Sequence, residues 1–121
     1  MSPVDVYMRN SVETASPLRQ IILLYEQAIL TLKSAIGYIE SSDVQSKGEA
    51  IAKVSDIVRV LDSALDFERG DKIAQNLHML YDFIQQSLFH IHAKNDTQLA
   101  HDLIEILENL KEGWEGIQSK V

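Results

Sequence analysis

Four segments of this sequence repeat apolar residues every three or four positions, which is the spacing that places them on one face of an α-helix. The four apolar stripes run from Leu18 to Ile39, from Ala50 to Leu65, from Ile73 to Ile91 and from Leu99 to Ile117. No segment alternates apolar and polar residues in the way that a half-buried strand does. The periodicity therefore predicts an all-α fold in which each helix has one face to bury.

Residues that favour helix ends separate the stripes: Ser16-Pro17, Asp43, Gly70-Asp71 and Asn95-Asp96. Serine and aspartate side chains can accept the unpaired N–H groups of a first turn, and proline suits the first helical position. We expect Gly70 to end the second helix in the left-handed conformation and Asp71 to cap the third. Connections this short place consecutive helices antiparallel. The sequence predicts an up-down-up-down four-helix bundle over residues 16–121, after a short N-terminal segment of residues 1–15.

Composition narrows the classes of function. The chain has 121 residues, which is typical of one domain, and no cysteine, which excludes disulfides and thiolate chemistry. Its 11 basic and 18 acidic residues give a net charge of −7, which disfavours binding to nucleic acid or to an anionic membrane. No apolar run approaches the ~20 residues of a membrane span, and the first ten residues do not resemble a secretion signal. We predict a soluble, cytoplasmic protein.

The sequence lacks two motifs that would indicate an enzyme. No glycine-rich loop leads into the lysine and serine or threonine of a phosphate site. No glutamate has a histidine three residues later, the spacing that supplies ligands to two-metal sites in bundles. We predict no catalytic residue, no metal and no cofactor, with a metal-dependent bundle enzyme as a disfavoured alternative.

Polar residues on the helices have local interpretations. His78 with Asp82, and His101 with Glu105, are four residues apart and are predicted to pair weakly on solvated faces. The acidic face of the fourth helix is expected to be solvated, and a contact with a basic partner remains open. Three aromatic residues, Tyr25, Tyr81 and Trp114, lie on core stripes, so their polar tips are expected to find a partner or water.

Several apolar residues lie off the stripes. At about 100° per residue, Val60 and Phe67 lie roughly 120° from the centre of the second helix's core face. Met79 and Phe83 lie roughly 130° from the centre of the third helix's core face, in the same angular sense. Depending on the handedness of the bundle, the two strips converge or diverge. Convergence would form an apolar groove for an amphipathic partner helix, whereas scattered apolar residues are ordinary on a surface.

The N-terminal segment contains Val4, Val6, Tyr7 and Met8 ahead of the first predicted helix. Chain termini are often disordered. Alternatively, this segment lies on an apolar groove and covers it, in which case deletion of residues 1–15 would tighten partner binding.

An ordered set of short motifs resembles the flagellin export chaperone family, FliS. The set comprises Tyr7, the run from Asn10 to Pro17, Leu24–Ala28, Leu80–Ile84, Asn95-Asp96 and Trp114. It spans nearly the whole chain at the family's spacing. Phe83 stands where the family commonly has tyrosine, and Val54 stands where alanine is common.

The resemblance implies an antiparallel bundle that binds the C-terminal segment of flagellin, blocks premature polymerisation and keeps flagellin competent for export. It also implies contact with the flagellar export machinery. In relatives, the N-terminal tyrosine segment can cover part of the binding surface, which carries that role onto Tyr7. Family contacts on the second and third helices would fall near Ile57, Leu61, Tyr81 and Ile84.

Together, these arguments predict nine partner-binding residues: Tyr7, Ile57, Val60, Leu61, Phe67, Met79, Tyr81, Phe83 and Ile84. A generic helical adaptor for another amphipathic partner is the main alternative. The sequence leaves open whether the free protein is a monomer or a homodimer.

Overall fold

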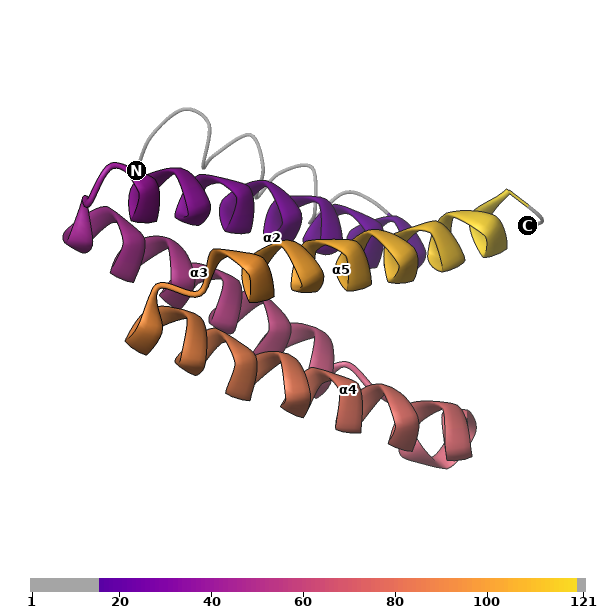
Figure 1. The fold of residues 1–121 in the computed structure, drawn as a ribbon. Helices are drawn as coiled ribbons and strands as arrows, with labels where there is room; N and C mark the ends of the chain where they lie inside the picture. The colour runs from indigo at the N-terminus through magenta and orange to yellow at the C-terminus, as the bar shows by residue number, and fades with distance from the viewer. Residues whose placement is uncertain (1–15, 120–121) are drawn as a thin grey trace.

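The computed structural model describes residues 16–119, which form four α-helices and no strand. The helices are α2 (Pro17–Glu40), α3 (Val44–Ser63), α4 (Phe67–Lys94) and α5 (Thr97–Gln118). Consecutive helices run antiparallel, with α2 and α5 in one layer and α3 and α4 in the other (Figure 1). The predicted up-down-up-down bundle is therefore confirmed.

The two layers are not parallel. They lie close together at the end that holds the α2–α3 and α4–α5 connections, which we call the closed end (Figure 1). They diverge toward the end that holds the α3–α4 connection, which we call the open end. The open end therefore leaves part of each layer's inner face uncovered by the other.

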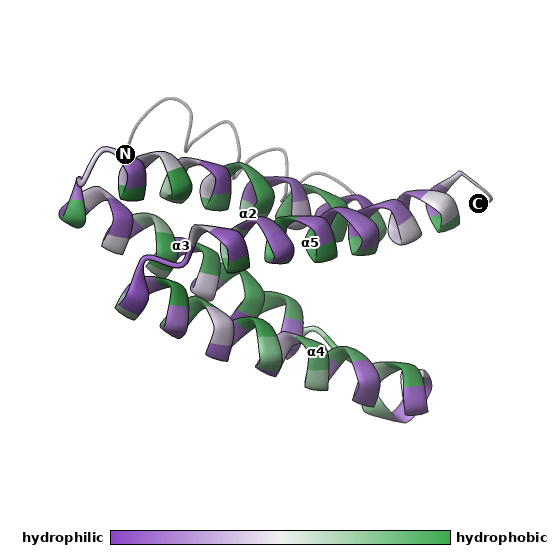
Figure 2. Ribbon diagram, viewed as in Figure 1, coloured by the Kyte–Doolittle hydropathy of each residue, from purple (hydrophilic) through white to green (hydrophobic). Residues whose placement is uncertain are grey.

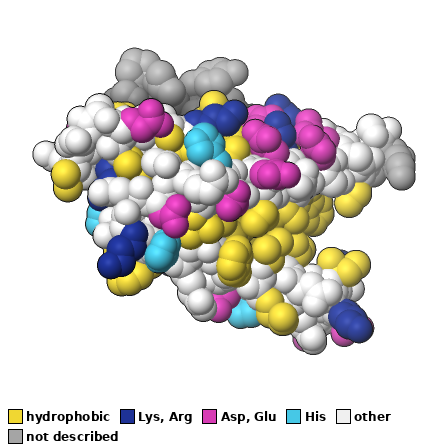
Figure 3. Space-filling model, in the orientation of Figure 1, with side chains coloured by type: hydrophobic (Ala, Val, Ile, Leu, Met, Phe, Trp, Pro, Cys, Tyr) yellow, Lys and Arg dark blue, Asp and Glu magenta, His cyan; other side chains and the backbone are white. Residues whose placement is uncertain are grey.

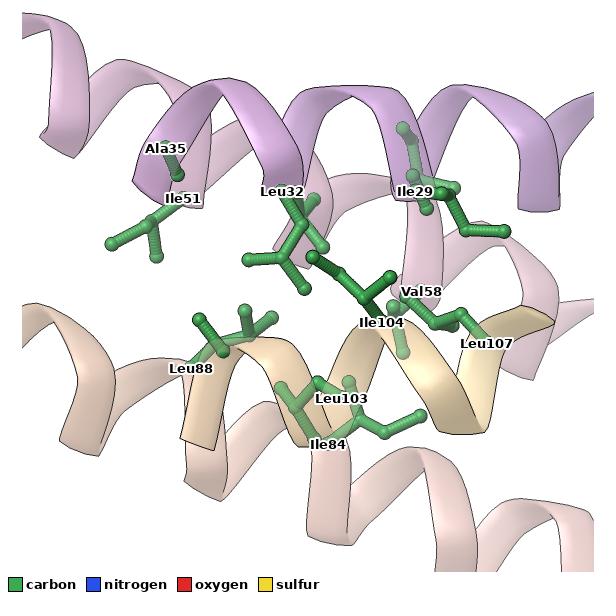
Figure 4. Packing of buried hydrophobic residues seen from close by; sticks show 14 of the residues in the cluster. Ile29, Leu32, Ala35, Ile51, Val58, Ile84, Leu88, Leu103, Ile104 and Leu107 are labelled. Carbon is green, nitrogen blue, oxygen red and sulfur yellow. The ribbon is translucent and has the colours of Figure 1, made fainter. Parts of the chain in front are cut away.

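The core is built from the predicted stripes. Hydrophobic and hydrophilic residues alternate along each helix, as amphipathic helices require (Figure 2). Leu32 of α2, Leu88 of α4 and Ile104 of α5 point into the same interior, and all three are buried (Figure 4). Two stripe residues depart from the prediction, because Ile73 is 71% exposed and Ile117 is 50% exposed. Both lie toward the open end, where the two layers diverge.

Three of the predicted helix starts and turns are confirmed. Ser16 accepts a hydrogen bond from the main-chain N–H of Arg19 (3.2 Å), and Asp43 accepts one from Ser46 (3.1 Å). Asn95 ends α4 in the left-handed conformation (φ 53°), which asparagine tolerates better than most residues. Its neighbour Asp96 then caps α5.

The predicted boundary between the second and third helices is wrong. The helix α3 ends at Ser63, and Asp66 caps α4 by accepting the main-chain N–H groups of the next turn. Aspartate at this position satisfies unpaired donors, and the helix start favours its negative charge. Consequently Phe67 is the first residue of α4 and does not belong to the second helix.

An irregular residue lies inside α4. Gly70 has no positive φ, whereas Asp71 adopts φ 46° and ψ −120°, and the helix is kinked there. Gly70 is needed for another reason, since a Cβ at this position would lie 2.9 Å from the Cβ of Ala74. The kink brings the first turn of α4 close to the following one, and only glycine fits without a shift.

Gly70→Ala is therefore expected to destabilise the fold by about 1–2 kcal/mol, the usual effect of overpacking. A matched control is Gly37→Ala in α2, where a Cβ would meet nothing within 4 Å. That change is expected to stabilise the protein by about 0.5–1 kcal/mol, because alanine restricts the unfolded chain and favours helix. Urea unfolding of both variants measures the two effects. Stabilisation by both substitutions would contradict the close approach at Gly70.

At the closed end, a buried lysine of α3 forms hydrogen bonds with the C-terminal end of α4. The Nζ atom of Lys47 donates to the carbonyl of His92 (3.1 Å) and to Oδ1 of Asn95 (2.8 Å), and the side chain is buried. A cation is favoured at the C-terminus of a helix, where carbonyl groups lack helical partners. Nearer the middle of the pair, Ser55 donates to Gln85 (2.7 Å), and Gln85 donates back to the Ser55 carbonyl (2.9 Å). These polar contacts fix α3 against α4.

Candidate partner-binding site

An apolar cleft of about 180 Å³ lies at the open end of the bundle, and all four helices contribute to it. We call it the end cleft; its lining residues are Ile21, Leu61, Ala64, Leu65, Asp66, Gly70, Ile73, Ala74, Leu77, Tyr81 and Trp114. Asp66 is the one charged residue in this lining. Figure 3 shows hydrophobic side chains gathered between the α5 side and the α4 side of the molecule.

The end cleft exists because the apolar stripes continue past the point where the two layers meet. Ile73 on α4 is largely exposed, and Leu65, Leu77 and Trp114 are only partly buried. Covering such surface is worth about 25 cal/mol per Å². An apolar concavity of this kind is typical of a site for another polypeptide.

Two tyrosines meet beneath the end cleft. The hydroxyl oxygens of Tyr25 and Tyr81 lie 2.5 Å apart, and the side chains are 0% and 2% exposed. Burial raises the pKa of Tyr25, although hydrogen bonding with Tyr81 and with Trp114 partly offsets the rise. Burial and the proximity of Tyr25 raise the pKa of Tyr81 as well. Both hydroxyls therefore keep their protons at neutral pH, and the expectation that these polar tips would find partners is confirmed.

The surface seam between α3 and α4 is polar. Asp62 of α3 and His78 of α4 are hydrogen-bonded across it (2.7 Å), and the ring of Phe67 meets the His78 ring edge-on at 5.9 Å. The weak pairing predicted for His78 and Asp82 is limited to an electrostatic contribution, and the hydrogen-bond partner of His78 is Asp62. His78 lies on the flank of α4 that faces α3, where Asp62 is the better-placed acceptor.

Asp62 raises the pKa of His78 above its ordinary value by accepting a hydrogen bond, and by its charge; Asp82 adds a smaller electrostatic contribution. The contact between protonated His78 and Asp62 stabilises the folded protein. This contribution is fully present below the unfolded pKa of about 6.5 and is lost as the pH rises through the raised pKa of His78 in the folded protein.

Asp62→Asn is expected to lower the pKa of His78 in an NMR titration. Asp82→Asn, the matched control, is expected to lower it less, and the opposite ranking would contradict the assignment.

The predicted apolar strips diverge. Val60 lies on the flank of α3 opposite Ser55 and Asp62, which contact α4. Met79 and Phe83 lie on the flank of α4 that points away from α3, because His78 and Gln85 on the other flank contact α3. All three side chains are exposed, and so is Phe67 at 48%. The two hollows between α3 and α4 are lined by other residues, so these strips do not share a groove there.

The other predicted contacts fall in three places. Leu61 and Tyr81 line the end cleft. Ile57 and Ile84 are buried in the core, at 8% and 0% exposure. Tyr7 lies outside the described residues.

Ile73, Leu77 and Trp114 were not predicted to line a cleft, because their helical spacing places them on core stripes. The helical period reports which residues share a face, but it does not report whether a neighbouring layer covers that face. The break at Gly70-Asp71, just before Ile73, was the available signal that α4 departs from a regular bundle here.

Other kinds of site are not assembled in the described part of the chain. None of its helices is both long and apolar enough to cross a membrane. Within residues 16–119, no three histidine, aspartate or glutamate side chains gather where they could hold a metal ion. The end cleft is the most apolar of the hollows described above.

This chain is similar to known proteins over nearly its whole length. Residues 1–121 match the family described as "Flagellar protein FliS". The chain is 35% identical over 117 residues to the flagellar secretion chaperone FliS of Salmonella typhimurium, covering 96% of this chain and 87% of that protein. It is also 35% identical over 121 residues to the flagellar secretion chaperone FliSB of Pseudomonas aeruginosa, covering 97% and 96%. These relatives are chaperones and not enzymes, and the chain belongs to the FliS family.

A solved structure agrees with the fold. A crystal structure of a flagellar chaperone from bacteria superimposes with a TM-score of 0.82, covering 98% of this chain and 96% of the other. The sequence identity is 20%, so this similarity concerns the arrangement of the helices.

Proposed function

We propose that this protein is a cytoplasmic flagellar export chaperone that binds the C-terminal segment of flagellin, prevents its premature polymerisation and keeps it competent for export. The observation that carries the proposal is the end cleft, an apolar concavity with Ile73 exposed at its wall, in a member of the FliS family. Relatives are named flagellar secretion chaperones, which supports a flagellar client.

The end cleft is large enough to hold a few side chains of a partner but not a whole helix. Its volume of about 180 Å³ holds only a few apolar side chains of a partner. Beyond it, the exposed side chains of Met79 and Phe83 extend apolar surface along the flank of α4 that points away from α3. A client segment inserts apolar side chains into the end cleft and lies along this flank. Val60 and Phe67 are reached only by a segment that continues around the bundle.

The energetics of a held segment fit release at the export machinery. A segment that is disordered when free loses conformational entropy on binding, so a large contact area yields only moderate affinity. The sequence contains no phosphate-binding loop with which ATP could drive release. Transfer of flagellin therefore depends on a binding site of the export machinery that competes with the chaperone for the flagellin segment.

Isothermal titration calorimetry with a peptide of the last ~40 residues of flagellin tests the proposal, since that length can span a bundle face at about 1.5–3.3 Å per residue. One-to-one binding with a negative heat-capacity change is expected, because apolar surface is buried. A scrambled peptide of identical composition is the control. Equal affinity for an unrelated amphipathic helix would favour the generic adaptor, and no binding to flagellin peptide would contradict the proposal.

A further inference from the structure

The two buried tyrosines beneath the end cleft have one proton too many for the bond between them. Each hydroxyl carries one proton, and the contact between the Tyr25 and Tyr81 oxygens uses only one of them. The second proton needs a different acceptor. A buried donor without an acceptor is energetically costly, so the identity of that acceptor matters.

The lining of the end cleft indicates which tyrosine keeps the spare proton. Either hydroxyl can donate in the contact between the two oxygens. Tyr25 is 0% exposed and does not line the end cleft, whereas Tyr81 lines it. Donation from Tyr25 to Tyr81 is therefore the arrangement in which the spare proton can reach an acceptor in the cleft. The proton of Tyr81 then ends this short donor chain.

Among residues 16–119, the Tyr81 hydroxyl forms no hydrogen bond other than the one with Tyr25. The Oδ1 atom of Asp62 is bonded to His78, and Asp62 acts on Tyr81 through its charge without a hydrogen bond. The carboxylate of Asp66 accepts the main-chain N–H groups at the start of α4. Tyr81 and Trp114, however, both line the end cleft. An acceptor that enters the end cleft can complete the chain.

We propose that the Tyr81 hydroxyl donates a hydrogen bond to a main-chain carbonyl oxygen of the segment held in the end cleft, and so selects a segment that is extended or ends a helix at that point. This inference rests on the proposed function. A carbonyl is the expected acceptor because every residue offers one, whereas a carboxylate would lose solvation in an apolar cleft. Carbonyls inside a helix already accept a helical N–H, so an extended residue or a helix end presents the better acceptor.

The test compares Tyr81→Phe with Tyr25→Phe in calorimetric titrations with the C-terminal flagellin peptide. Tyr81→Phe removes the terminal donor and is expected to weaken binding about five- to tenfold. Tyr25→Phe disrupts the same pair but leaves the Tyr81 hydroxyl free to donate, so affinity is expected to stay within about threefold. Thermal unfolding establishes that both variants are folded. Equal affinities of wild type and Tyr81→Phe would overturn the inference while leaving the proposed function intact.

An amide-to-ester scan of the peptide, made on the wild type and on Tyr81→Phe, provides a second measurement. An ester carbonyl is a weaker acceptor, so one position is expected to weaken binding to the wild type. The same ester is expected to have little effect on Tyr81→Phe, because the donor is already absent. Identical ester profiles for both proteins would overturn the inference, and a peptide that does not bind wild type at all would overturn the proposed function with it.

Discussion

Ile73→Asp is expected to weaken binding of the flagellin C-terminal segment at least a hundredfold while the bundle remains folded. Ile73 lines the end cleft, and at 71% exposure it contributes little to the core. The substitution removes about 1.5–3 kcal/mol of apolar burial at the interface. It also places a charge where the partner would strip its water, which adds a comparable penalty. Calorimetry with the ~40-residue peptide measures the loss.

Phe89→Asp is the matched control for this prediction. Phe89 lies on the same helix and is 76% exposed, but it borders a hollow between α3 and α4 away from the end cleft. Both variants exchange an exposed apolar side chain of α4 for the same charge. Affinity is expected to change less than about threefold in Phe89→Asp, and similar losses in both variants would contradict the location of the site.

Leu32→Ala is expected to destabilise the fold by about 3 kcal/mol, the typical result of emptying a buried leucine site. Leu32 is 0% exposed at the centre of the core, where its neighbours belong to several helices (Figure 4). For a domain of this length the melting temperature should fall by about 10 °C. Urea unfolding and thermal melts measure both quantities.

Leu30→Ala serves as its control. Leu30 is two residues away on the same helix and is 60% exposed, so the change should alter stability by less than about 0.5 kcal/mol. Comparable destabilisation by the two substitutions would mean that the periodicity misidentifies the core face of α2.

Local chemistry explains why most of the fold was predictable. The side chains of Ser16 and Asp43 accept first-turn N–H groups, and Asn95 adopts the left-handed cap, as their residue types indicate. The one wrong boundary arose where two signals competed. Gly70 is a strong helix terminator by type, but Asp66 provided an N-cap four residues earlier, and glycine served close packing against Ala74 instead.

The site was less predictable because it depends on how the layers sit relative to each other. The period places Ile73 and Ile117 on core faces, yet the divergence of the layers exposes both. Likewise, the helical wheel places Val60 and Phe83 at similar angles from their core faces, but only the handedness of the bundle decides that they diverge. Single-helix patterns contain no information on either property.

The pairing of His78 illustrates the same limit at the level of one side chain. Spacing along a helix suggests Asp82, four residues away, whereas the packed structure offers Asp62 from the neighbouring helix at 2.7 Å. Contacts between helices that lie far apart in sequence require the packed arrangement.

Methyl NMR of the isoleucine-labelled protein during titration with the C-terminal flagellin peptide directly tests whether flagellin binds at the end cleft. Ile21 and Ile73 line the end cleft, while Ile36 and Ile51 lie toward the closed end. We expect the δ1 methyl signals of Ile21 and Ile73 to shift in proportion to complex formation, while those of Ile36 and Ile51 move little. Binding that shifts Ile36 and Ile51 but leaves Ile21 and Ile73 unchanged would contradict it.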